Sequence, residues 1–385
     1  MAKSNRIYLD YASSALQKSA NPGAIHALGV KEKQKLEDAR RRVARILGAN
    51  NDEIIFTSGA TESNNITILG LPKGHIVTTN IEHASVLETC KHRGNVIFVE
   101  VEKNGIVDSK KIKKALTKET MLVSVSYANN EIGTIQPISE IAKEIRHYNK
   151  KNMKKIFFHT DATQAINYLP IKIPKLGVDL MSFNGAKIYG PQGVGILYVK
   201  KNTPISKIMF GGDQERGLRP GTENVTGAVA LAFALEATEK IKEQEVKRLT
   251  KLRDYFIKEL SRTFFFSGLP ASHRQPFIKE SSASFIVNGD LKNRLPNNVN
   301  ITIPNIPSDL LVIELSTRGI MASAKSACKA GDGKASHVIQ AINPQAKDTD
   351  GSLRFSLGRE TTKKDIDYTI KSLTEILQKL KKWYN

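Results

Sequence analysis

Two residues in the middle of the chain could together hold a pyridoxal phosphate (PLP) cofactor. Asp161 ends a β-rich run, and Lys187 follows 26 residues later in the Gly-bracketed turn 185–190. This spacing is about one strand–helix–strand step. PLP needs a lysine amine for a Schiff base and an acid that keeps its pyridine nitrogen protonated. Each residue alone is a weak signal, and Asp161 alone would be explained as a helix N-cap.

The segment Thr57–Glu62 could bind the phosphate of such a cofactor. Its small residues follow a strand and precede a helix. The backbone N–H groups at such a helix start form an anion site. The same letters also fit a Ser or Thr cap with Glu62 in the first turn. Asp161 and Lys187 downstream favour the phosphate.

The two cysteines of the chain have different settings. Cys90 follows Val86–Leu87 at helical spacing, so we predict that it lies in the core. Cys328 lies among small and polar residues, between Lys325 and Lys329. Neighbouring cations favour the thiolate form of a cysteine. Cys328 is therefore the candidate nucleophile.

Arg354 lies on a strand-like stretch with apolar neighbours, residues 352–358. A planar guanidinium suits bidentate binding of a substrate carboxylate. A structural ion pair would explain Arg354 equally well if it stood alone.

The elements that must position these residues alternate between short β-rich runs and longer amphipathic segments. This order predicts an α/β fold with a mostly parallel sheet. The predicted strands are Glu53–Thr57, His75–Thr79, Val96–Val101, Met121–Ser126, Ile156–Thr160, Leu180–Phe183 and Gly193–Val199. The predicted helices include Ala60–Gly70, Ser85–Arg93, Ser109–Leu116 and Ile138–Asn149.

A long helix, predicted over Gly227–Leu260, carries the chain from a large domain into a smaller one near residue 245. The later part reads as an α+β unit with strands at 285–287, 299–303 and 353–356. We predict a large PLP-binding domain of residues 12–245. Residues 1–11 and 246–385 would form the small domain, with the Cys328 loop at about 323–336.

The composition is that of an ordinary soluble protein, with 40% hydrophobic and 25% charged residues among 385. We find no apolar run of about 20 residues and no signal peptide. Two cysteines form neither a disulfide framework nor a four-cysteine metal site, so we expect a cytoplasmic protein without a metal. The net charge is +20. Its basic runs lack aromatics, which favours a lysine-rich surface over direct nucleic-acid binding.

Taken together, these residues resemble the cysteine desulfurases of the NifS/IscS type, in the class-V aminotransferase group of fold-type-I PLP enzymes. The similarity runs from Tyr8 almost to the C-terminus, and is closest in segments 57–65, 129–134, 161–164 and 214–224. It implies the PLP-dependent transferase fold, with a mostly parallel seven-stranded sheet in the large domain and a smaller α+β domain.

The resemblance also implies a role for individual residues. Lys187 would carry the cofactor and move the substrate Cα proton, and Cys328 would attack the substrate sulfur. His83 would stack on the ring and assist proton transfer. Asp161 would pair with the pyridinium nitrogen, and Gln164 would bond the ring hydroxyl. The remaining implied residues are Ala60, Thr61, Asn184 and Ala186 around the phosphate, Thr222 on the phosphate of a neighbouring subunit, and Asn130 and Arg354 on the substrate carboxylate.

The implied reaction removes sulfur from L-cysteine, giving L-alanine and a persulfide on Cys328. The implied assembly is a homodimer, because Thr222 would serve the neighbouring subunit. The length between Cys328 and Arg354 matches the long-loop subgroup of the family. That favours an iron–sulfur scaffold or a tRNA-thiolation protein as the sulfur acceptor.

Four departures from the family pattern stand out. Asn184 and Ala186 replace the usual Ser and His of the phosphate site. Lys325 replaces a usual Gly beside Cys328. Residues 12–22 are shorter than expected, and residues 264–284 resemble an insertion. The altered phosphate site and the short N-terminal stretch put activity in more doubt than fold.

Two alternatives remain at this point. One is a selenocysteine lyase or another class-V PLP enzyme that uses Cys328 differently. The other is a degenerate, non-catalytic desulfurase homologue that acts as a binding partner. Retention of Lys187, Asp161, His83, Cys328 and Arg354 argues for an enzyme, whereas the altered phosphate site argues for the homologue.

Overall fold

The computed structural model describes residues 20–263, 265–266, 284–324 and 336–384. Cys328 and Lys325 lie outside the described residues. So do residues 1–11, which were predicted to join the small domain, and most of the expected insertion at 264–284.

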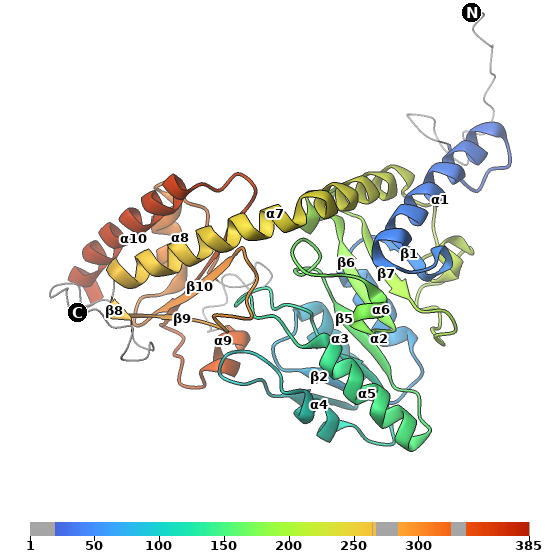
Figure 1. Ribbon diagram of the computed structural model, residues 1–385, viewed down its shortest axis with the longest axis horizontal. Helices are drawn as coiled ribbons and strands as arrows, with labels where there is room; N and C mark the ends of the chain where they lie inside the picture. Colours follow the sequence, from blue (N-terminus) through green and yellow to red (C-terminus); the bar gives the residue numbers. More distant parts are fainter. Residues whose placement is uncertain (1–19, 264, 267–283, 325–335, 385) are drawn as a thin grey trace, which may run out of the picture.

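The larger of two sheets has seven strands, as the sequence predicted (Figure 1). The run of strands from β6 to β3 is parallel, whereas β7 pairs antiparallel with both β1 and β6. Each strand coincides with a predicted run, and no strand end differs from its predicted position by more than two residues. The order across the sheet is β1 (Ile54–Thr57), β7 (Gly195–Val199), β6 (Leu180–Asn184), β5 (Phe157–Asp161), β4 (Thr120–Ser124), β2 (His75–Thr79) and β3 (Val96–Val99).

Helices cover both faces of this sheet, which is why its inner strands are apolar on both sides. The strand pleat sends Ile54 and Phe56 into one core cluster and Ile55 into the other. The helices before residue 264 that contribute to the first cluster are α1 (Ala27–Leu47), α4 (Ser109–Ala115), α5 (Ile138–Asn152), α6 (Ile173–Leu176) and α7 (Val225–Thr263). Those that contribute to the second are α2 (Ala60–Gly70) and α3 (Ala84–Arg93).

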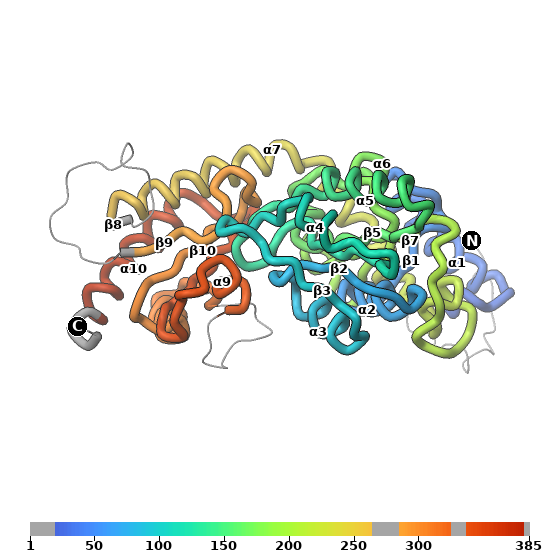
Figure 2. The backbone as a smooth tube through the Cα atoms, turned by 90° about the horizontal axis from the view of Figure 1, so that it is seen from below, coloured from blue at the N-terminus to red at the C-terminus, as the bar shows by residue number. Residues whose placement is uncertain are grey.

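The 39-residue helix α7 extends from the large sheet to a second, four-stranded sheet (Figures 1 and 2). Its early residues, from Val225 to Leu235, pack in the large-sheet core, and Leu249, Phe256 and Leu260 pack in the core of the second sheet. The predicted domain boundary near residue 245 falls between these two sets and stays a prediction.

The second sheet and its helices form the predicted smaller α+β unit. Strand β10 pairs antiparallel with β9 and β11, and β8 pairs parallel with β9. The strands are β8 (Phe265–Phe266), β9 (Ser284–Val287), β10 (Asn298–Ile303) and β11 (Gly351–Ser356), and the helices are α8 (Ser308–Ser316), α9 (His337–Ile342) and α10 (Lys363–Tyr384).

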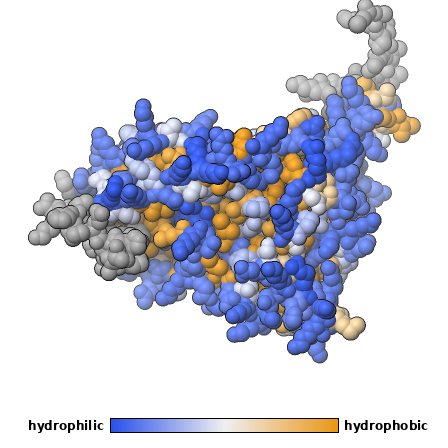
Figure 3. Space-filling view, viewed as in Figure 1, coloured by the Kyte–Doolittle hydropathy of each residue, from blue (hydrophilic) through white to orange (hydrophobic). Residues whose placement is uncertain are grey.

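The two units also touch directly. Val338 and Ile339 of α9, together with Leu295, belong to the core cluster of the large sheet. Hydrophilic residues cover most of the face seen in Figure 3, and hydrophobic residues show mainly in its middle. None of the described helices is both long enough and apolar enough to cross a membrane.

Candidate active site

Asp161 and Lys187 lie at the carboxyl ends of neighbouring parallel strands. Asp161 ends β5 and pairs in register with Ser182 of β6. The turn that follows β6 carries Lys187, and its backbone is fixed by side-chain amides. Asn184 Oδ1 accepts from the Lys187 N–H (3.2 Å), and Asn167 Nδ2 donates to the Lys187 carbonyl. The Lys187 side chain is exposed, which leaves its amine available to a ligand above the sheet.

The Asp161 carboxylate is buried at 7% exposure and is held by neutral donors. Its Oδ2 accepts from Asn64 Nδ2 (2.8 Å), and its Oδ1 accepts from the Thr163 N–H (2.9 Å). Within the described residues, no Lys or Arg forms an ion pair with it. A buried carboxylate in such a setting is best matched by a cationic N–H, such as that of a pyridinium ring.

His83 belongs to the same hydrogen-bond network. It caps the start of α3, where its Nδ1 accepts from the Ser85 N–H (3.2 Å) and lies 2.9 Å from Ser85 Oγ. Asn64 Nδ2 donates to that same hydroxyl (2.9 Å). Asn64 and Ser85 therefore join His83 to Asp161. The sequence analysis identified neither residue as part of the site. The only sequence signal for Asn64 was a polar residue on a short apolar helix that packs on the sheet.

The start of α2 fits a phosphate group. Gly59 is its N-cap and no side chain caps the first turn, so backbone N–H groups face outward there. A Cβ at residue 195, where β7 begins, would lie 2.6 Å from the Gly59 Cα. Position 195 therefore requires glycine, because β7 passes so close to this turn. Ala60 is buried and Thr61 is exposed at this helix start.

The other residues expected at the phosphate offer fewer donors. Ala186 is exposed and has no hydrogen-bonding side chain. Asn184 uses its Oδ1 within the turn, so its amide NH2 is the group left to donate. Thr222 is exposed on the segment before α7, and Gln164, on the turn after β5, is half-buried.

A buried ion pair anchors the loop that leads to Thr222. The Glu215 carboxylate accepts from both terminal nitrogens of Arg40 (2.8 and 2.7 Å) and from the Phe56 N–H (2.8 Å). Burial is the largest influence on the pKa of Arg40, but bonding and attraction to Glu215 outweigh it and the pKa is raised. The loop is therefore fixed against β1 and α1.

Arg354 and Asn130 come together from the two units. The Arg354 guanidinium donates to the Asn130 carbonyl (3.0 Å) and to Ser323 Oγ (3.1 Å). Its buried Nε has no hydrogen-bond partner within the described residues, so it can serve a substrate carboxylate. Burial lowers the pKa of Arg354, and the nearby Glu131 opposes that shift. Ser323, which the sequence analysis missed, also exchanges backbone bonds with Arg354 (3.1 and 2.7 Å).

Glu131, next to Asn130, bonds residues from the second unit. The chain re-enters the described structure at Ser336, whose hydroxyl donates to the buried Glu131 carboxylate. The Glu131 carbonyl accepts from the amides of Asn298 (2.9 Å) and Asn300 (3.1 Å). Ser323 thus contacts Arg354 and Ser336 contacts Glu131, whereas Cys328 lies outside the described residues.

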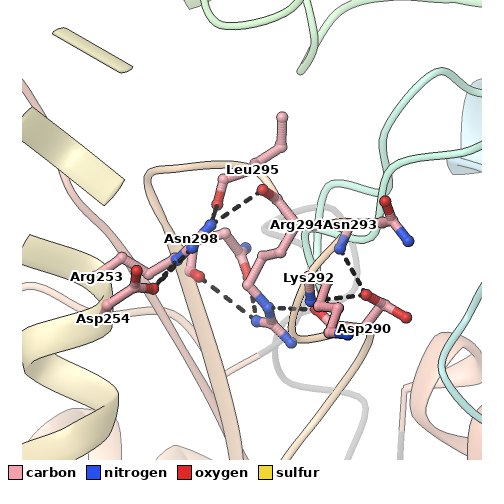
Figure 4. A network of polar contacts seen from close by, with 8 residues as sticks. All are labelled: Arg253, Asp254, Asp290, Lys292, Asn293, Arg294, Leu295 and Asn298. Atoms are coloured by element: carbon pink, nitrogen blue, oxygen red, sulfur yellow. Dashed lines mark hydrogen bonds and ion pairs between the residues drawn. The ribbon is translucent and has the colours of Figure 1, made fainter. Parts of the chain in front are cut away.

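Two buried arginines hold the loop that precedes β10 (Figure 4). Arg294 donates to the Asp290 carbonyl (2.9 Å) and to Asn298 Oδ1 (3.2 Å). Arg253 of α7 donates to the carbonyls of Arg294 (3.1 Å) and Leu295 (3.2 Å). Burial, with the adjacent Arg253 charge, lowers the pKa of Arg294 to about 10.

This loop in turn pairs with the loop that carries Asn130. Leu295 N–H donates to the Gly133 carbonyl, and Ile135 N–H donates to the Asn293 carbonyl, both at 2.8 Å. The two buried arginines thus fix Asn130 relative to the second sheet. A site shared between both units is built on this junction.

The fold and site define a class: an α/β enzyme with a lysine and a buried acid at one edge of a mostly parallel sheet, and an arginine presented from a second sheet. The chain belongs to the aminotransferase class-V family, whose model matches residues 3–369. Within that family it is similar to the cysteine desulfurases of the NifS/IscS type.

Three comparisons illustrate the similarity. A cysteine desulfurase IscS of Dictyoglomus turgidum is 39% identical, over 97% of this chain and 95% of that protein. A solved NifS-like protein is 34% identical with a TM-score of 0.82, over 94% of this chain and 92% of its own. The structure of SspA in complex with cysteine is 30% identical with a TM-score of 0.71, over 90% of this chain and 94% of its own.

Proposed function

We propose that the chain is a PLP-dependent cysteine desulfurase, which removes the sulfur of L-cysteine and releases L-alanine. The observation that carries the proposal is the arrangement of three groups. Buried Asp161 ends β5 and exposed Lys187 follows the neighbouring strand β6. Arg354 lies on β11 of the second sheet, and its Nε has no hydrogen-bond partner among the described residues. Similarity to cysteine desulfurases, and to a structure with cysteine bound, supports the same reaction and substrate.

The cofactor-binding residues have distinct tasks in this proposal. Lys187 would hold PLP through its amine, and Asp161 would keep the proton on the pyridine nitrogen. His83 and Gln164 would bind the ring. The residues that would bind the phosphate are Ala60 and Thr61 at the start of α2, Asn184 and Ala186, and Thr222 of a second subunit.

When bound, PLP supplies a ring that accepts electrons and so weakens the bonds at the substrate Cα. Arg354 and Asn130 bind the L-cysteine carboxylate and orient the substrate, and Lys187 moves the Cα proton. The Cys328 thiolate then attacks the substrate sulfur. A sulfur–sulfur bond forms, the Cβ–S bond breaks, and its electron pair stays with the carbon skeleton. That carbon takes up a proton, Lys187 returns a proton to Cα, and the product leaves as L-alanine, while Cys328 keeps the sulfur as a persulfide.

The proposal involves two kinds of protein partner. The first is a second copy of the chain, which supplies Thr222. The adjacent side chains of Met209 and Phe210, in the segment that leads to Thr222, are 44% and 86% exposed, which is consistent with their burial against such a copy. The second is a sulfur acceptor, either an iron–sulfur scaffold or a tRNA-thiolation protein, that receives the Cys328 sulfur. Light scattering would distinguish a dimer from the 42.6-kDa single chain.

The deciding experiment measures alanine release from L-cysteine by purified protein with added PLP and a thiol reductant. The matched variants are Cys328→Ser, which keeps the cofactor site, and Lys187→Ala, which loses the amine. Alanine formation that requires both residues would support the desulfurase. Bound PLP without alanine would point to another amino-acid substrate. Failure to bind PLP would favour a non-catalytic homologue.

A further inference from the structure

We propose that Asn64 is a positioning residue that orients Asp161 and, through the Ser85 hydroxyl, helps to fix the proton position on the His83 ring. This inference rests on the proposed function, because both residues face the proposed PLP site. Asn64 lies in the middle of α2, and its side chain is fully buried at 0% exposure.

The orientation of the Asn64 amide is fixed by its neighbours. Its Nδ2 donates to Asp161 Oδ2 (2.8 Å) and to Ser85 Oγ (2.9 Å), so both amide hydrogens are used. Turning the amide round would place its oxygen against the Asp161 carboxylate, and two acceptors would then repel each other. The nitrogen therefore faces Asp161.

Packing alone does not explain why residue 64 is an asparagine. Its Oδ1 is buried and has no hydrogen-bond partner within the described residues. A buried acceptor without a partner costs free energy, and asparagine is a poorer helix former than leucine or alanine. An apolar side chain would serve the fold better here, so the two donated bonds point to a role in the site.

The same contacts determine the tautomer of His83. The Ser85 N–H donates to His83 Nδ1 (3.2 Å), which makes that nitrogen an acceptor. The neutral ring therefore carries its proton on Nε2. Ser85 Oγ accepts a hydrogen from Asn64, which leaves its own hydrogen available to His83 Nδ1, 2.9 Å away. Through the Ser85 hydroxyl, Asn64 thus helps to determine which nitrogen of His83 can donate.

The test compares full-length Asn64→Ala and Ser85→Ala with Asn65→Ala. Asn65 is a matched control on the same helix, because its amide donates only to the Thr61 carbonyl outside this network. Two quantities are measured: the dissociation constant of PLP, and the ¹⁵N NMR shifts of the His83 ring in histidine-labelled protein, assigned with His83→Gln.

We expect Asn64→Ala to weaken PLP binding about 10-fold or more, since it removes a bond to a charged group. We also expect both Asn64→Ala and Ser85→Ala to reduce the Nε2–H fraction of His83, and Asn65→Ala to leave both quantities unchanged. A packing role alone would lower thermal stability without moving the His83 spectrum.

Wild-type affinity and an unchanged His83 tautomer in both variants would overturn the inference. If Asn64→Ala does not fold, Ser85→Ala decides, because it breaks the link to His83 at a half-buried position. The tautomer is read in protein with and without PLP, so its outcome is separate from that of the proposed function. A wild-type chain that forms no alanine refutes the desulfurase, whatever the His83 spectrum shows.

Discussion

Glu82, which precedes His83, carries a large penalty for ionisation. Its carboxyl is 1% exposed, and it accepts hydrogen bonds from Thr79 Oγ1 (2.6 Å) and from the Ser126 N–H (3.1 and 3.0 Å). Burial raises the pKa of Glu82 from 4.5 to about 7, and the nearby Asp161 charge adds to the rise. The folded protein therefore binds a proton at Glu82 more tightly than the unfolded chain does.

The sign and size of the effect on stability follow from this difference. The contribution of protonated Glu82 is fully present below pH 4.5 and is lost as the pH rises through about 7. At 1.36 kcal/mol per pKa unit, the total loss is about 3 kcal/mol. Most of it, about 2 to 3 kcal/mol, falls between pH 5 and pH 8.

We expect Glu82→Gln to remove this pH dependence, because an amide of the same shape does not ionise. Urea unfolding at several pH values from 5 to 8 would give the free energy of unfolding of both proteins. The stability of the variant relative to wild type should rise by about 2 to 3 kcal/mol over that range. The control is Glu88→Gln, which changes an exposed carboxylate on α3, the helix that follows Glu82. A stability difference that stays constant with pH would refute the reasoning.

Three further predictions concern other residues. Arg354→Lys should raise the KM for L-cysteine about 10-fold, with less effect on kcat, because one amine cannot replace three directed N–H groups; steady-state kinetics would check this. Arg40→Met should lower the free energy of unfolding by about 3 to 5 kcal/mol, since Glu215 is left buried without its cation; adding Glu215→Gln should restore part of it. Burial lowers the pKa of His159 to about 4, so stability is lost as the pH falls from 6.5 to 4. His159→Gln should show about 3 kcal/mol less acid loss in the same unfolding assay extended down to pH 4.

Most of the large sheet could be predicted because its signals are local. A strand buried on both faces must be apolar throughout, and short apolar runs between amphipathic segments identify it. The ends of the strands were predicted less accurately than their positions, because strand pairing depends on residues distant in the sequence. Asp161 was placed just after a strand, yet its carbonyl accepts from the Tyr127 N–H (2.9 Å) and the residue belongs to β5.

The site could be predicted only where one residue carries its own chemical signal. Lys187, Asp161 and Arg354 stand out by type and by their place after or within a strand. Asn64 does not, because its role depends on Asp161, 97 residues away in the sequence. The Arg354 bond to the Asn130 carbonyl spans 224 residues, and a backbone acceptor has no residue type to recognise. Such pairings are fixed by topology and leave no local pattern.

The altered phosphate site is the strongest argument for a non-catalytic homologue. The structure weakens this argument, because other donors remain near residue 186. Replacing a side-chain donor by Ala186 removes one bond to a charged group, which weakens binding about 10- to 150-fold. The donors at the start of α2 belong to the backbone and do not depend on residue 186. Asn184 retains an amide donor in the same turn. Because several donors would share the phosphate, we expect the loss at Ala186 to lower cofactor affinity without removing the basis for binding. The intact Asp161 network favours an enzyme.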